Sequence, residues 1–70
     1  MNIWINKVEG DRISGLAVVA ARNNFEAHGI LTKTDNWYNS YFKFENWKCI
    51  AEANVMSNTP YMVSVVCRKS

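Results

Sequence analysis

The chain has 70 residues, of which 49% are hydrophobic and 20% charged, so it has room for one small folded domain and is too apolar for an intrinsically disordered protein. Its formal net charge of +2 comes from scattered lysines and arginines, which argues against a dedicated nucleic-acid-binding domain. Its apolar runs are shorter than the ~18 residues of a membrane helix, which argues against a membrane protein.

The N-terminal segment predicts a β-hairpin. Residues Asn2–Val8 form a short β-rich run whose side chains alternate between two faces. The next three residues, Glu9–Asp11, include a glycine and are typical of a turn. Ile13–Ala21 is nearly continuous in apolar residues, which favours a strand that is buried on both faces or close to it.

A short helix is predicted from Asn24 to about Lys33. Asn23 and Asn24 are good N-cap residues, and Glu26 would place a negative charge in the first turn, where it complements the helix dipole. Phe25 falls roughly opposite the apolar stripe, so it is either a staple at the helix start or an exposed anchor. The stripe that would pack on a sheet consists of Ala27, Ile30 and Leu31.

The C-terminal half predicts three more strands. Tyr41–Glu45 alternates like a strand, Trp47–Met56 follows with Cys49 and Ala51 on one face, and Ser57–Pro60 is dense in turn formers. The last strand is Tyr61–Arg68. Its predicted inward face consists of Tyr61, Val63, Val65 and Cys67.

This order, β-β-α-β-β-β, predicts a single α+β domain over residues 1–70, with a largely antiparallel sheet of four to five strands and one short helix packed on one face. One short helix cannot cover a whole sheet on both sides. The second face must therefore meet water or another copy of the chain, and we favour another copy. The apolar residues assigned to that face are Trp4, Val8, Ile50, Met62 and Val66.

The sequence contains no recognisable catalytic or metal-binding set. His28 is the only histidine, and Glu26 lies two residues away, where a helix turns it to another side. Cys49 and Cys67 have no neighbouring metal-ligand motif, and we expect reduced thiols, although a disulfide between them stays open. We therefore expect no enzyme activity, no metal and no cofactor. The absence of a signal-peptide pattern predicts a cytoplasmic protein.

Six of the nine aromatic residues lie between positions 37 and 47, interleaved with lysines. They can form the core, anchor a protein interface, or stack a ligand, and these roles can combine. Phe42 and Phe44 are expected in the core, whereas Trp37, Tyr38 and Trp47 flank polar turns and are expected to be exposed. The candidate partner- or ligand-binding residues are Arg22, Trp37, Tyr38, Tyr41, Lys43, Trp47 and Lys48.

These features predict a non-enzymatic small binding protein that self-associates and acts by occupying a partner protein. In size and aromatic content the chain is similar to phage-encoded inhibitors and ligand-sequestering proteins. The alternative is an oligomer that sequesters an anionic nucleotide in a pocket between subunits, with Arg22, Lys43 and Lys48 meeting the phosphates. Single-stranded nucleic-acid binding through the same rings is a third hypothesis, and we do not expect it.

Overall fold

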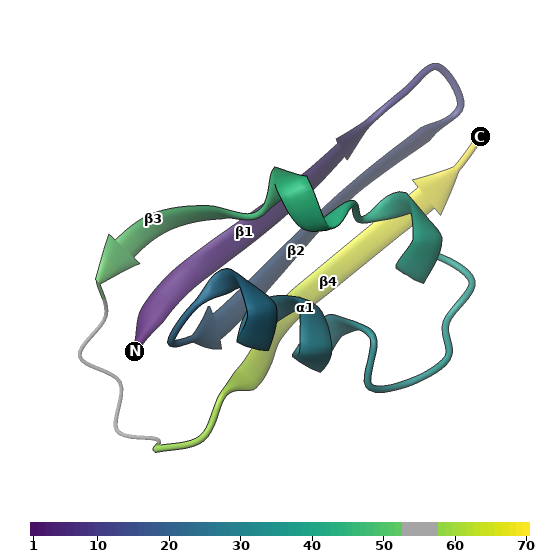
Figure 1. Cartoon of the computed structure of the whole chain (residues 1–70). Helices are drawn as coiled ribbons and strands as arrows, with labels where there is room; N and C mark the ends of the chain where they lie inside the picture. The colour runs from purple at the N-terminus through teal and green to yellow at the C-terminus, as the bar shows by residue number, and fades with distance from the viewer. Residues whose placement is uncertain (53–57) are drawn as a thin grey trace.

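The structure is a computed structural model that describes residues 1–52 and 58–70. Its four strands form one antiparallel sheet in the order β3-β1-β2-β4, with a helix on one face (Figure 1). The predicted α+β class is therefore confirmed. The last residues of the predicted 47–56 strand and the first of the predicted turn lie outside the described residues. The elements are β1 (Asn2–Glu9), β2 (Ile13–Ala21), α1 (Asn24–Leu31), β3 (Lys48–Glu52) and β4 (Tyr61–Lys69).

The predicted N-terminal hairpin is confirmed. Strands β1 and β2 pair from Asn2 opposite Ala21 to Glu9 opposite Ser14, and the Gly10 N–H donates to the Ile13 carbonyl at 2.9 Å to close the turn. The second half of β2 is completely buried except for Val18, whereas its first half is partly exposed. The apolar run therefore marks a central strand, buried on both faces only where the helix and both neighbouring strands flank it.

The helix begins as predicted. The Asn23 side-chain oxygen accepts a hydrogen bond from the Glu26 N–H at 2.9 Å, and the Glu26 carboxylate in turn accepts from the Arg22 N–H at 2.9 Å. The helix ends at Leu31, two residues earlier than expected. The reason is local: both the N–H and the hydroxyl of Thr32 donate to the His28 carbonyl, which completes the last turn.

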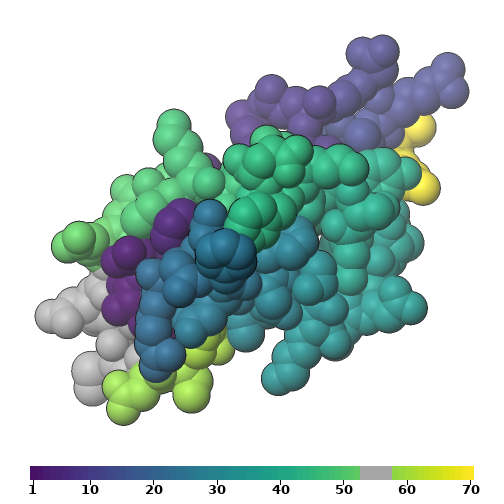
Figure 2. Space-filling view, in the orientation of Figure 1, coloured from purple at the N-terminus to yellow at the C-terminus, as the bar shows by residue number. Residues whose placement is uncertain are grey.

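The predicted strand Tyr41–Glu45 is wrong. This segment instead contains two short 3-10 helices, η1 (Asn39–Tyr41) and η2 (Phe44–Asn46), and it crosses the same face of the sheet as α1 (Figures 1 and 2). A buried side chain of β1 holds it there, because the Asn6 Nδ2 donates to the Lys43 carbonyl at 2.7 Å. The segment therefore acts as a second cover over the core rather than as a sheet strand.

The predicted inward face of β4 is wrong at the start of the strand. Val65 and Cys67 do pack against the core, but a register shift between β2 and β4 reverses the pattern before them. Tyr61 lies opposite Ala20, which places it on the face turned away from the helix. Such a bulge inserts one extra residue, so simple alternation fails across it.

A similar shift affects β3. The pairing with β1 places Cys49 opposite Trp4 but Ala51 opposite Ile3, and these two residues of β1 point to opposite faces. The prediction that Cys49 and Ala51 share a face is therefore wrong. All five residues of β3 are exposed, as befits a short edge strand.

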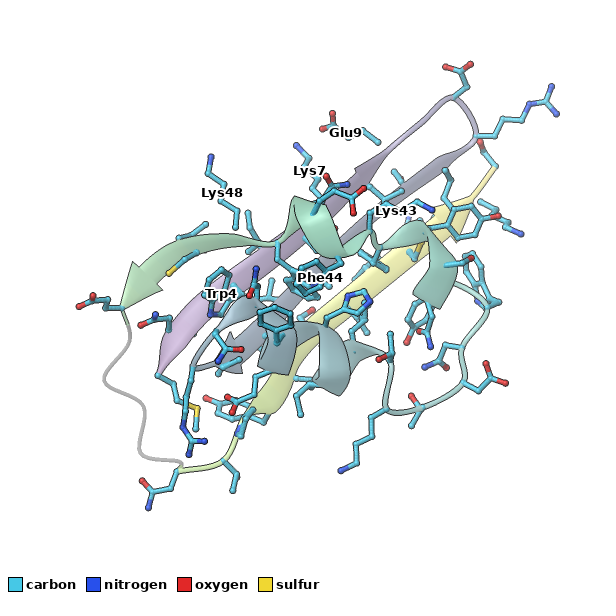
Figure 3. All side chains as sticks on the ribbon, in the orientation of Figure 1. Trp4, Lys7, Glu9, Lys43, Phe44 and Lys48 are labelled. Carbon is cyan, nitrogen blue, oxygen red and sulfur yellow. The ribbon has the colours of Figure 1, made fainter. Side chains whose placement is uncertain are left out.

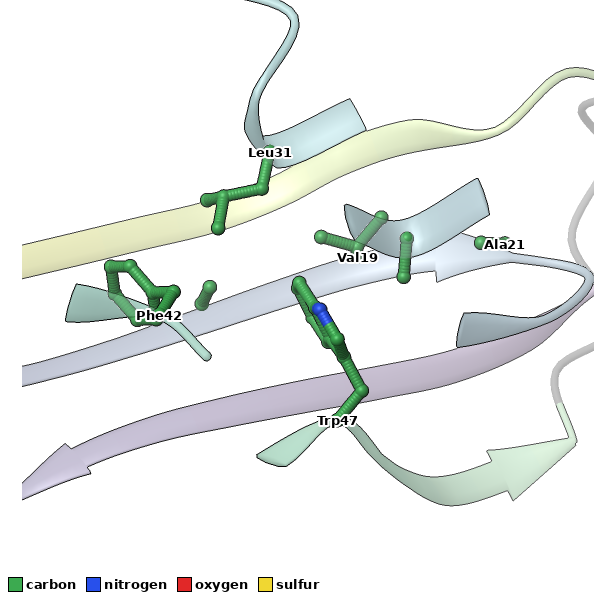
Figure 4. Packing of buried hydrophobic residues seen from close by; sticks show 7 residues of the cluster. Val19, Ala21, Leu31, Phe42 and Trp47 are labelled. Atoms are coloured by element: carbon green, nitrogen blue, oxygen red, sulfur yellow. The ribbon is translucent and has the colours of Figure 1, made fainter. Parts of the chain in front are cut away.

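The core lies between the sheet and the layer formed by α1 and the aromatic segment (Figure 4). Phe42 is almost fully buried, as predicted, and Phe44 packs against the cluster while partly buried. The buried cluster consists of Ala17, Val19, Ala21, Ala27, Leu31, Phe42 and Trp47. The small side chains of β2 allow the large rings to approach the sheet closely.

Two glycines should respond oppositely to alanine. A Cβ at Gly15 would lie 3.0 Å from the Cys67 Sγ and 3.1 Å from the Phe42 ring, whereas a Cβ at Gly29 meets nothing within 4 Å. Gly15→Ala should therefore lower the free energy of unfolding by about 1–3 kcal/mol through overpacking. Gly29→Ala should raise it by about 0.5–1 kcal/mol through helix propensity. Urea denaturation followed by circular dichroism measures both, and a stabilising Gly15→Ala would contradict this packing.

Candidate interaction surfaces

The sheet face turned away from α1, called the open face below, carries a continuous apolar surface. Residues directly opposite one another in an antiparallel sheet share a face, so the register defines four rows of side chains across the strands. The rows are Ala51, Ile3, Ala20 and Tyr61; Lys48, Ile5, Val18 and Ser64; Lys7, Leu16 and Val66; and Glu9, Ser14 and Arg68.

Most of the side chains in the first three rows are apolar, and several are well exposed. Leu16 is 42% exposed, Val66 52% and Tyr61 40%. Among the described residues, α1 and both 3-10 helices lie on the other side of the sheet (Figure 1). The open face is therefore an apolar surface bounded at one end by a charged row, which is typical of an interaction site.

The prediction of an uncovered apolar face thus identified the right kind of surface but partly the wrong residues. Trp4, Val8 and Met62 pack against the core on the helix side. Of the five residues assigned to this face, Val66 does lie on it, and Ile50 is exposed at the β3 bulge. The error arose because the hairpin register, which decides the inward face of β1, depends on packing that no local pattern reveals.

A shallow hollow of about 410 Å³ lies at the charged end of the open face, and its lining includes Lys7, Glu9, Leu16, Val66 and Arg68. The Lys7 ammonium lies 2.6 Å from the Glu9 carboxylate. Hydrogen bonding to Lys7 and its positive charge lower the pKa of Glu9, and Glu9 in turn raises the pKa of Lys7. Because both side chains are well exposed, water screens this pair; Figure 3 shows both side chains at the outside of the molecule.

Three of the seven candidate binding residues come together in one cluster. The ring centroid of Trp37 lies 5.6 Å from that of Tyr38 and 6.1 Å from that of Tyr41, and both ring pairs have edge-to-face geometry. The Lys69 ammonium at the end of β4 lies 5.0 Å from the Trp37 centroid and 5.5 Å from that of Tyr41. No local pattern in the sequence marks Lys69 as a binding residue, because only the fold brings the last strand beside residues 37–41.

Trp37 is 53% exposed, as predicted, but the prediction that Tyr38 is exposed is wrong, because it is partly buried against the core. Trp47 does not belong to this cluster, and the prediction that it is exposed is also wrong. It is only 7% exposed, and its indole N–H donates to the His28 Nδ1 at 2.9 Å. His28 is partly buried on α1, and it uses its Nδ1 lone pair to accept this hydrogen bond. The pair therefore joins the helix to the aromatic segment and has a structural role.

The three cations proposed for an anionic ligand come from three different parts of the fold. Arg22 pairs with Glu26 at 3.2 Å and donates to the Asn58 carbonyl at 2.9 Å, beside the start of the helix. Lys48 borders the open face on β3, and Lys43 is exposed between the two 3-10 helices (Figure 3). Of the three, only Lys43 is close to the aromatic cluster in the sequence, since it follows η1 directly after Phe42.

Within residues 1–52 and 58–70, no group of three His, Cys, Asp or Glu side chains is placed to hold a metal ion. Both cysteines are free thiols, with Cys49 exposed and Cys67 partly buried. None of the described helices is long and apolar enough to cross a membrane.

Comparison with known proteins gives no further guide. No protein-family model, no curated protein and no solved structure matches the chain.

Proposed function

We propose that this chain is a non-enzymatic binding protein that pairs with a second copy through the open face and acts by occupying the surface of a partner protein. The observation that carries the proposal is the apolar open face, where Leu16, Val66 and Tyr61 remain exposed. An apolar area of this kind, bordered by charged residues, favours association over hydration.

The size of the face supports a second copy as its occupant. The two longer dimensions of the molecule, 37 and 23 Å, give a cross-section of about 850 Å², which is of the same order as the ~800 Å² that each partner buries in a standard interface. Two such faces can pack as two aligned sheets, with apolar rows interdigitating in the centre. The charged row of Glu9 and Arg68 then lies at the rim, where it stays hydrated.

Sedimentation equilibrium tests the self-association directly. The wild-type chain should give twice the mass of one chain, and Leu16→Lys or Val66→Lys should weaken the dimer by about a hundredfold or more, because burying an unpaired charge costs ~3 kcal/mol or more. These two residues lie directly opposite each other on the open face, in the apolar row next to the charged one.

Phe25→Lys is the matched control, because Phe25 is 73% exposed but lies on the helix side. It should leave the dimer unchanged. A wild-type chain that stays monomeric at all concentrations, or a dimer that survives Leu16→Lys and Val66→Lys, would overturn the self-association part of the proposal.

A further inference from the structure

The free edge of β4 suggests where a partner protein binds. This strand has nine residues and lies at the margin of the sheet, where β2 is its one neighbour among the described strands. The opposite margin is formed by β3, which has five residues and a register shift within them. A long edge strand offers a row of unpaired backbone groups to an added strand, whereas a short irregular one does not.

One hydrogen bond determines which β4 groups face the free edge. The Ser70 N–H donates to the Arg12 carbonyl at 2.9 Å, one position beyond the pair of Ile13 and Lys69. Since hydrogen-bonded and non-bonded pairs alternate in an antiparallel ladder, the N–H and C=O groups of Lys69, Cys67 and Val65 point away from β2. Apart from the hydrogen bonds within the sheet, no backbone hydrogen bond joins these groups to another described residue.

An apolar groove of about 370 Å³ runs beside this edge. One wall is formed by Ile30 and Tyr38, and the other by Met62 and Val65 of β4. Tyr61 also lines the groove although it points to the open face, which places the groove along the strand margin rather than beneath the sheet. An added strand would place alternate side chains in this groove while its backbone pairs with β4.

The charges around the groove favour an acidic occupant. Lys33 is the only charged residue in its lining, and it forms no ion pair with any described residue. Further along the strand, β4 ends in Arg68 and Lys69. A second copy of β4, paired antiparallel about Val65 or Cys67, would bring its own Lys69 opposite Tyr61 or Val65, which line the groove together with Lys33. Like charges there oppose a second copy and favour a segment with carboxylates.

We infer that β4 binds an extended segment of a partner protein by strand addition, with alternating apolar side chains in the groove and an acidic residue beside Lys33. This inference rests on the proposed role of the chain in occupying a partner protein, and it names the site and the chemistry of the segment recognised. It does not depend on pairing through the open face.

The test uses a displayed library of random peptides as the probe, selected on the full-length chain. The enriched peptides should alternate apolar and polar residues and carry an acidic residue. N-methylation of the Val65 backbone nitrogen, introduced by ligating a synthetic 49–70 fragment at Cys49, should weaken their binding at least about tenfold, because it removes an edge donor and adds bulk at the edge.

Lys33→Glu should weaken the same peptides by about tenfold, and Arg12→Glu is the matched control, since it makes the same charge change in the exposed turn between β1 and β2. The Arg12 variant should bind within about twofold of wild type, because Arg12 is not part of the groove lining and its charge is screened. Thermal unfolding of the methylated and unmethylated synthetic chains would show whether the fold is retained.

Failure to enrich any alternating acidic peptide, or binding that N-methylation leaves unchanged in a folded chain, would overturn the inference. If dimerisation survives Leu16→Lys but is lost on N-methylation, the β4 edge binds a second copy, and the inference that it binds a partner segment is wrong. If Leu16→Lys gives a monomer that still binds the peptides, self-association through the open face and strand addition at β4 are each supported. If the wild type is monomeric and still binds the peptides, only self-association fails.

Discussion

Phe42→Ala is expected to lower the free energy of unfolding by about 3–5 kcal/mol, the loss typical of deleting a buried ring. Phe42 is 1% exposed and its ring lies against Gly15 of β2, so the cavity would open at the centre of the sheet. A core of this size rarely provides more than ~3–5 kcal/mol of stability, so the variant should be largely unfolded at room temperature. Urea denaturation followed by tryptophan fluorescence measures the loss.

Two further variants keep this prediction testable if Phe42→Ala does not fold. Phe42→Leu should cost only about 1–2 kcal/mol and give a complete denaturation curve. Phe25→Ala removes the same ring from an exposed position that packs against the partly buried Phe44, with ring centroids 5.0 Å apart. It should cost less than about 1 kcal/mol. Equal losses for Phe25→Ala and Phe42→Ala would contradict the core described above.

Asn6→Asp is expected to have the second large effect, a loss of at least about 3 kcal/mol at neutral pH from an unpaired buried charge. Asn6 is fully buried on β1 and its Nδ2 donates to the Lys43 carbonyl, while its Oδ1 has no hydrogen-bond partner. A carboxylate there would face a carbonyl oxygen with no donor between them. It would release the aromatic segment from the sheet.

The pH dependence of Asn6→Asp provides a specific signature. Burial would raise the pKa of the introduced carboxyl in the folded state above its unfolded value, so the charged form penalises folding. The penalty is absent below the unfolded pKa, and it grows as pH rises until the folded pKa is passed. A protonated carboxyl could also donate to the Lys43 carbonyl. In acid, the free energy of unfolding of the variant should therefore approach that of the wild-type chain at the same pH.

Asn6→Ala is the matched variant without a titratable group. It should cost about 2–3 kcal/mol, because the hydrogen bond to the Lys43 carbonyl and the packing of the fully buried Asn6 side chain are both lost, and this cost should not change with pH relative to wild type. Chemical denaturation at several pH values measures both variants. Suppose that the stability of Asn6→Asp, measured relative to wild type, is no higher in acid than at neutral pH. That result would show that Asn6 is not buried away from water.

These core residues matter for the proposed function because they decide what remains for binding. Phe42, Trp47 and Asn6 fix the aromatic segment on the helix side of the sheet. That layer removes Trp47 from the candidate binding residues and leaves the open face without a cover. It also positions Tyr38 as one wall of the groove beside β4. Binding and folding thus depend on the same placement of one irregular segment.

The sequence by itself determined the elements whose signals are local. The hairpin turn at Gly10, the continuous apolar run of β2 and the Asn23 cap each act through neighbouring residues, so their positions were predicted closely. The α+β class and the presence of an unshielded apolar sheet face follow from the same signals, because one short helix cannot cover two faces.

Only the tertiary structure decided which residues occupy each face and what covers the core. Tyr41–Glu45 alternates as a strand would, but a side-chain hydrogen bond from Asn6 and the burial of Phe42 hold it as turns above the sheet. The bulges in β3 and β4 reversed the faces of Ala51 and Tyr61. These outcomes depend on contacts between residues distant in the sequence, whose energies no local pattern contains.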